Sequence, residues 1–335
     1  MLEKMRPLLA QAHGEEAPQS GNRTVAAFLE EWMAGLDLRL RPSTAKRYRD
    51  ILRLHAIPVI GRVKLARLTP QQVEALLAER RAAGLAPRTV WHLRAVLRSA
   101  LTDALRAGEV TRNAASLAHP PKVEAYHVEP MTPARAQSIL QALAGTDLEA
   151  PVSLALWTGL RQGELLGLRW ADIDLATRRL RVEVTLQYRK REFSVEPTKT
   201  PKSRRTIGLP APAAEMLTRH RQKQLEQRLL VGPEWDSRFD GLVFTNPFGR
   251  PLDGRYLTVR FQNLVSRAGL GAIRFHDLRH AAATLMLASG TDLKVVSEVL
   301  GHSAIATTAN VYAGVLDELK TEAADRLARL LRPIH

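Results

Sequence analysis

The chain has 335 residues, which favours two domains because a single hydrophobic core seldom grows that large. It has no cysteine, so disulfides, thiolate metal sites and cysteine nucleophiles are excluded. Lysine and arginine exceed aspartate and glutamate by 49 − 34 = 15, which favours nucleic acid as a partner over a merely solvated basic surface. The sequence contains no apolar run of about 18 residues and no secretory signal, so we expect no membrane span and a cytoplasmic location.

Helical periodicity over residues 24–108 predicts a first domain of four helices, preceded by an extension over residues 1–23. Ser43 is the expected N-cap of the second helix. The third helix has a clear start, since Thr69 is followed by proline and then by the glutamine of a capping box. Gly108 ends the fourth helix.

Residues 109–130 lose the helical period and contain three prolines, which predicts a linker. A second, mostly helical domain is expected over residues 131–335, opened by a Thr-Pro cap at position 132. Alternating apolar and polar residues over about 179–208 predict two or three short antiparallel strands, and a brief strand is expected at 242–245. The predicted fold class is mainly α (α+β), with an all-helical first domain and a small antiparallel β-sheet in the second.

Four stretches of the second domain combine cationic side chains with one phenol. They are TGLRQGELLGLRW, PTKTPKSRRTIGL, HDLRH and GHSAIATTANVY. Taken singly, each residue is better explained as a solvated or core side chain, but their order along the chain changes that interpretation. The candidates are Arg161, Lys199, His276, Arg279, His302 and Tyr312.

The order Arg, Lys, His-x-x-Arg, Gly-His, Tyr resembles the tyrosine recombinase (integrase) family. The matching segments include LALWTGLRQGELLGLRWADIDL, RFHDLRHAAATLMLASG and VVSEVLGHSAIATTANVYAG. The stretches RPSTAKRYRDIL and LAPRTVWHLRAVLRSAL resemble the core DNA-binding domain of the family. The resemblance implies a site-specific recombinase that cleaves and rejoins DNA through a 3′-phosphotyrosine intermediate and a Holliday junction, without a metal or other cofactor.

The resemblance makes Tyr312 the nucleophile. A phenol has a pKa of about 10 and reacts poorly at neutral pH, so the site must stabilise the charge that develops on the phosphate. Arg161 and Arg279 suit this role because a guanidinium stays charged and grips two phosphate oxygens. His276 and His302 would add hydrogen bonds, and one of them would take the phenol proton.

Lys199 is the expected proton donor to the leaving 5′ oxygen, and the family's T-K-T motif favours it over Lys202. Glu164, one helical turn after Arg161, resembles the acidic member of a family Gly-acid pair, and we expect it to brace a catalytic base or arginine. The alternative is an ordinary surface carboxylate.

A metal site is not predicted. His276 and His280 have the i, i+4 spacing of many zinc ligands, but no third ligand is evident in the sequence.

The expected partner is double-stranded DNA, clamped between the two domains. Five residues of the first domain lie near helix starts, where backbone amides also attract phosphate. They are Ser43, Thr44, Lys46, Arg88 and Thr89. The resemblance implies a homo-tetramer on paired DNA sites, compatible with a monomer in free solution, and leaves accessory DNA-bending proteins open.

Two other functions stay open, relaxation of supercoils in the manner of a type IB topoisomerase and DNA-binding regulation without catalysis. The sequence does not set the target site, the bias between integration and excision, or the choice between a phage integrase and a chromosomal resolvase. About 22 residues precede the first core helix, too few for the arm-binding domain of many phage integrases. We therefore expect either a simple core site or a truncated form.

Overall fold

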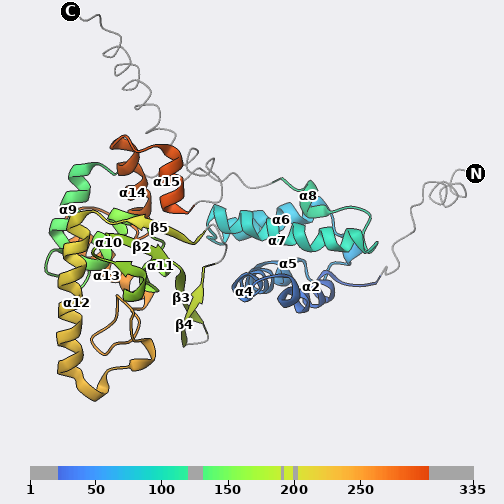
Figure 1. Cartoon of the computed structure of the whole chain (residues 1–335). Helices are drawn as coiled ribbons and strands as arrows, with labels where there is room; N and C mark the ends of the chain where they lie inside the picture. The colour runs from blue at the N-terminus through green and yellow to red at the C-terminus, as the bar shows by residue number, and fades with distance from the viewer. Residues whose placement is uncertain (1–21, 120–130, 190–191, 199–202, 302–335) are drawn as a thin grey trace, which may run out of the picture. The chain divides into compact units, whose positions relative to one another are not determined.

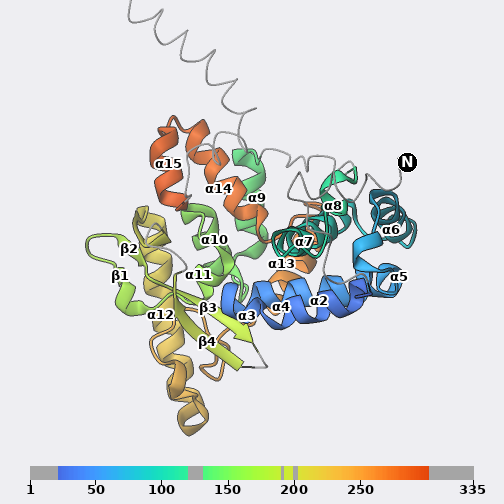
Figure 2. The ribbon, with the colours of Figure 1, turned by 90° about the vertical axis from the view of Figure 1, so that its right-hand side faces the viewer.

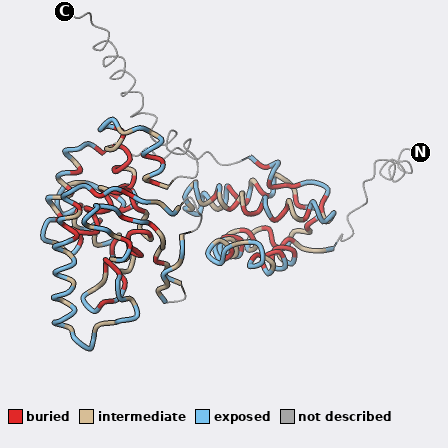
Figure 3. The backbone as a smooth tube through the Cα atoms, viewed as in Figure 1, coloured by how far each residue is buried: buried red, intermediate tan, exposed pale blue. Residues whose placement is uncertain are grey.

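The structure is a computed structural model of the chain, and it describes residues 22–119, 131–189, 192–198 and 203–301 (Figure 1). The chain divides into two compact units, Met1–Tyr126 and His127–His335. Each unit buries an apolar core of its own, and the buried residues are the red stretches of the tube in Figure 3. The described residues are mostly helical with small antiparallel sheets, so the predicted fold class is confirmed. Within these ranges no helix has the length and apolarity that a membrane span requires.

Over residues 22–119 the first unit is helical, as predicted, apart from one isolated bridge between Thr24 and Lys64. A π-helical turn over Leu52–Ala56 connects its second long helix to a short one, and a 3-10 turn over Leu65–Arg67 precedes the third. The helices are α2 (Val25–Ala34), α3 (Leu36–Arg39), α4 (Pro42–Ile51), α5 (Ile57–Ile60), α6 (Pro70–Ala82), α7 (Pro87–Arg106) and α8 (Ala114–Leu117).

The ends of these helices test the expected caps. Thr69 forms the predicted capping box. Its side chain accepts from the Gln72 backbone N–H, and the Gln72 side chain accepts from the Thr69 backbone N–H. The prediction for Ser43 was wrong, because α4 begins at Pro42, two residues earlier than a Ser43 cap implies, and Arg41 is its N-cap. Pro42 explains the difference, since its fixed φ suits the first helical position.

The helical unit extends beyond Gly108, which corrects the predicted start of the linker at residue 109. Asn113 caps α8 through the Ser116 amide, and its side-chain amide donates to the Arg98 carbonyl on α7. Small apolar residues of this segment are buried in the core of the first unit. A helix of only four residues shows no period in the sequence, and its packing on α7 was therefore not predictable from the pattern.

The second unit opens with the predicted cap, since the Thr132 side chain accepts from the Arg135 backbone N–H. Helix α10 is buried along nearly its whole length and lies among α9, α11, α12 and α14 (Figures 1 and 2). The helices are α9 (Pro133–Leu143), α10 (Glu149–Thr158), α11 (Gln162–Leu166), α12 (Ala211–Val231), α13 (Gly254–Arg267), α14 (Asp277–Ala288) and α15 (Leu293–Leu300). Short 3-10 turns occur at Trp170–Asp172, Gly232–Glu234 and Ser237–Phe239.

The strands of the second unit form two antiparallel sheets. One has the order β1-β2-β5 and pairs Leu180 with Ile207, and the other is the β3-β4 hairpin. The region 179–208 therefore holds four strands, where two or three were predicted. At 242–245 there are only isolated bridges and no strand. The strands are β1 (Ile173–Asp174), β2 (Arg179–Val182), β3 (Val184–Arg189), β4 (Glu192–Pro197) and β5 (Arg205–Gly208).

Candidate active site

Arg161 stands at the junction of two helices. Gly159 ends α10 in the left-handed conformation, with a φ of 62°, and Arg161 is the N-cap of α11. Glu164, in the first turn of α11, accepts a hydrogen bond from the Arg161 backbone N–H at 3.0 Å. Its other oxygen accepts from the Arg161 guanidinium at 2.8 Å. The local sequence thus fixes both the backbone and the side chain of Arg161 with one carboxylate.

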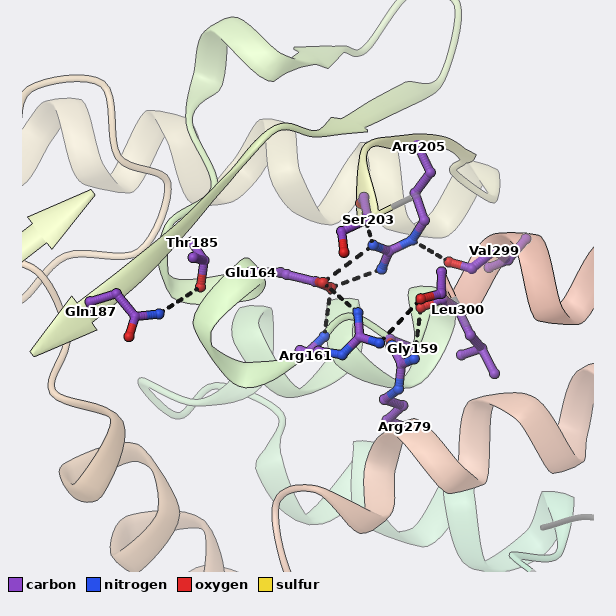
Figure 4. Close-up of polar contacts among 11 residues, drawn as sticks. Gly159, Arg161, Glu164, Thr185, Gln187, Ser203, Arg205, Arg279, Val299 and Leu300 are labelled. Carbon is purple, nitrogen blue, oxygen red and sulfur yellow. Dashed lines mark hydrogen bonds and ion pairs between the residues drawn. The ribbon is translucent and has the colours of Figure 1, made fainter. Parts of the chain in front are cut away.

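Glu164 is buried and shared by two guanidinium groups (Figure 4). Its side chain is 5% exposed, and Arg205 reaches it from β5 at 2.8 Å. Burial by itself raises the pKa of this carboxyl, but the hydrogen bond and charge of Arg205, joined by Arg161, outweigh burial and leave the pKa lowered. The carboxylate is therefore ionised at neutral pH. The contact with Arg161 agrees with the expectation that Glu164 braces an arginine, and the surface alternative is excluded by its burial.

Arg205 is a residue that sequence reasoning missed. Its side chain is 6% exposed and donates to Glu164, to the Val299 carbonyl at 2.5 Å and to the Ser203 carbonyl at 3.1 Å. A signal was present in TPKSRRTIGL, because the period of two in a strand puts Arg205 on the same face as the buried Ile207.

Helix α14 contributes His276 and Arg279. His276 is the N-cap of the helix, and Arg279 is 4% exposed within its first turn. The Arg279 guanidinium donates to the Gly159 and Leu300 carbonyls, each at 2.7 Å. Burial, followed by the positive charge of Arg279, lowers the pKa of His276 below its ordinary value of 6.5. The imidazole is therefore neutral at pH 7 and able to accept a proton.

His280 follows His276 by one helical turn on α14. The His276 and His280 rings meet edge to face with centroids 5.2 Å apart. No group of three or more potential metal ligands occurs among the residues that the structure describes.

Three arginines converge on the end of α15. Arg205 donates to the Val299 carbonyl, Arg279 to the Leu300 carbonyl and Arg161 to the Gly301 carbonyl (Figure 4). The C-terminal end of a helix presents unpaired carbonyls and a partial negative charge, which favours cations there. The structure thus brings Arg161 and Glu164 of α11 together with Arg279 of α14, more than 100 positions away in the chain.

The remaining predicted site residues lie outside the described part of the chain. They are Lys199, its competitor Lys202, His302 and Tyr312. His302 directly follows Gly301, whose carbonyl accepts from Arg161.

The five predicted DNA-binding residues lie at the starts of two helices. Ser43, Thr44 and Lys46 are in the first five residues of α4, and Arg88 and Thr89 are in the first turn of α7. Ser43, Lys46 and Thr89 line one groove of about 370 Å³, together with the cation of Arg47. Arg88, in the first turn of α7, is exposed, with its guanidinium 5.3 Å from the Trp91 ring centroid. Two helix starts therefore present their side chains on a common face of the first unit.

The class of protein follows from the chemistry of the second unit. Guanidinium groups bind phosphate oxygens, and a neutral histidine beside them can transfer a proton. Such a set on a helical domain, in a chain with a basic first unit, defines an enzyme that acts on the phosphodiesters of nucleic acid.

Two family models match the chain. The model of the phage integrase family covers residues 129–318, and that of the phage integrase N-terminal SAM-like domain covers residues 24–79. The chain belongs to the phage integrase family, the tyrosine recombinases that break and rejoin DNA at specific sites.

Relatives of the chain carry corresponding names. It is 38% identical to a tyrosine recombinase XerC-like protein of Caldanaerobacter subterraneus over 210 residues, which cover 60% of this chain and 54% of that protein. This chain therefore spans about half the length of that relative. It is 31% identical to an integrase of Streptomyces ambofaciens, over 86% of this chain and 76% of that protein.

Solved structures share the fold. The Tn1549 transposon integrase in complex with transposon right end DNA matches with a TM-score of 0.75 and 20% identity, over 91% of this chain and 99% of that one. A lambda integrase tetramer bound to a Holliday junction matches with a TM-score of 0.64 and 21% identity, over 89% and 82%.

Proposed function

We propose that this chain recombines DNA at a specific core site by transferring a strand to Tyr312. The proposal rests chiefly on the convergence of Arg161, Arg279 and His276 from remote segments, beside the start of the segment that carries His302 and Tyr312. In the proposed reaction the phenol oxygen forms a bond to phosphorus while the bond from phosphorus to the 5′ oxygen breaks. The phosphotyrosine ester retains the energy of that bond, so attack by a 5′ hydroxyl restores the phosphodiester.

The arginines are assigned to the phosphate. The Arg161 side chain is 41% exposed, and so it can reach a ligand while one of its nitrogens stays on Glu164. Arg279 is buried, and it donates to the Leu300 carbonyl, next to the Gly301 carbonyl that accepts from Arg161. Because Glu164 and the helix carbonyls hold these guanidinium groups before DNA arrives, little reorganisation is needed as charge builds on the phosphate oxygens.

The histidines and the lysine are assigned to proton transfer. His276 is neutral at pH 7 and suits a hydrogen-bonding or proton-accepting role toward the Tyr312 phenol. His302 would assist it, and Lys199 would protonate the leaving 5′ oxygen.

The proposed assembly is a homo-tetramer on two paired DNA duplexes. Recombination of two duplexes requires four strand cleavages, and lambda integrase has been solved as a tetramer bound to a Holliday junction. The groove on α4 and α7 is proposed to contact duplex DNA, in the cytoplasm where the substrate lies. The need for accessory DNA-bending proteins stays open.

Trapping the covalent intermediate tests this function. DNA captured by the wild-type protein is recovered and sequenced to define the core site, which is then nicked so that the cleaved end is lost. Wild-type protein should form a covalent adduct with this DNA, and Tyr312→Phe should bind it without forming one. A Phe variant that still cleaves would show that another residue is the nucleophile, and relaxation of DNA without any core site would favour the topoisomerase alternative.

A further inference from the structure

Arg205 has no part in the reaction proposed above, yet it is buried and bonded directly to Glu164, which holds Arg161. Its guanidinium makes a bidentate contact with Glu164, through Nη2 at 2.8 Å and Nη1 at 3.3 Å. Glu164 in turn holds both the backbone N–H and the guanidinium of Arg161. Arg205 and Arg161 therefore depend on one buried carboxylate, and a change in the first must alter the position of the second.

The same guanidinium also fixes the end of α15. Its Nε donates to the Val299 carbonyl, while Arg279 and Arg161 take the next two carbonyls. Gly301 has a φ of 65°, and a Cβ added there would lie 3.0 Å from the Arg205 Nη1 atom. The close approach shows that Arg205 and this turn are fitted to each other.

Burial makes the contacts of Arg205 strong and hard to replace. Removing one member of a buried ion pair leaves the other charge without compensation, which is costly. Lysine at this position would keep the charge but lose the planar fork that serves the carboxylate and the carbonyl at once.

We propose that Arg205 is a positioning residue for strand cleavage, acting through Glu164 on Arg161 and through the Val299 carbonyl on the end of α15. The catalytic part of this inference rests on the proposed function. Arg205 itself need not touch DNA, because its contacts with Glu164, Val299 and Ser203 all lie within the protein. By this route β5 sets the distance between Arg161 and the segment that begins with His302.

The test compares Arg205→Met with a matched control, Arg204→Met, in the full-length protein. Arg204 is the adjacent residue of the chain. Its side chain is 59% exposed and forms an ion pair with Glu183 at 3.8 Å. Three quantities are measured for each variant, the dissociation constant for core DNA, the single-turnover cleavage rate at saturating DNA, and amide hydrogen exchange in peptides covering α15.

Arg205→Met should bind core DNA like wild type and cleave it about 10–100-fold more slowly, since small misplacements of catalytic groups cost up to about that much. Exchange in α15 should be faster than in wild type. Arg204→Met should leave both cleavage and exchange unchanged, and Arg205→Lys should recover part of the rate.

A purely structural role is separated by combining the substitution with Arg161→Lys. If Arg205 acts through Arg161, adding Arg205→Met to the Arg161→Lys variant should slow its cleavage by less than about three-fold, because the effects of coupled residues are not additive. Full additivity, or a wild-type cleavage rate in Arg205→Met, would overturn the inference. If wild-type protein formed no adduct, the proposed function would fail. The positioning role is tested separately, because it would be refuted if hydrogen exchange in α15 were the same in Arg205→Met as in wild type.

Discussion

Two ion pairs, one from each unit, hold their charges in opposite ways. In the second unit Glu164 and Arg205 are almost fully buried, and each has defined partners. In the first unit Lys46 is 76% exposed and pairs with Asp50 one helical turn away on α4. The comparison suggests that buried charges set the geometry of the reaction, whereas exposed charges supply attraction to DNA that many residues share.

The largest expected effect is on cleavage by Arg161→Ala. Loss of a preorganised donor to the phosphate should slow single-turnover cleavage about 100- to 1,000-fold, while binding of core DNA changes little. Quenched reactions on the nicked site would measure it. A variant that cleaves at the wild-type rate would contradict the idea that the charges held around Glu164 set the geometry of the reaction.

The next effect is on folding, through Glu164→Gln. Two guanidinium groups lose their shared anion in a buried place, so we expect the free energy of unfolding to fall by about 3 kcal/mol. Chemical denaturation with urea would measure the change. In wild type this contribution is present above the ordinary carboxyl pKa of 4.5 and lost as the pH falls through the lowered value in the folded state. A change below about 0.5 kcal/mol, typical of a surface pair, would contradict the assigned role of burial.

A smaller effect is expected from pH. Because burial and Arg279 lower the pKa of His276, its neutral form prevails above its ordinary value of 6.5. Cleavage should therefore be nearly independent of pH from about 7 to 8 and should fall only at more acidic pH, as the pH passes through the lowered pKa of the imidazole. The pKa of the neighbouring His280 is lowered as well, first by burial and then by the charge of His276. Single-turnover rates between pH 5 and 8 measure this, and a rate that rises on acidification would exclude His276 as the proton acceptor.

The smallest effect is expected from Lys46→Gln in the first unit. An exposed pair contributes little to folding, so stability should change by less than about 0.5 kcal/mol. If Lys46 contacts a DNA phosphate, the slope of log K against log salt should lose about 0.9. Fluorescence anisotropy over a range of salt would measure the slope. An unchanged slope would remove this lysine from the proposed DNA contact.

Local signals in the sequence predicted the parts of the fold that depend on neighbours. The capping box at Thr69 involves residues three apart, and it is present. Ser43 failed because a proline one residue earlier set the helix start.

Long-range packing was harder to predict. Arg205 meets Glu164 across 41 positions of the chain, and only its alternation with a buried isoleucine hinted that it points inward. Helix α8 was missed because four residues carry no period. The convergence of three arginines on the α15 carbonyls depends on tertiary structure that no local pattern encodes.

Peptide mapping of the trapped adduct shows which residue receives the DNA strand. Wild-type protein is reacted with the nicked core site, digested with nuclease and protease, and the modified peptide is identified by mass spectrometry. The nucleotide should be attached to the peptide containing Tyr312. Attachment to any of the other four tyrosines, Tyr48, Tyr126, Tyr188 or Tyr256, would contradict it.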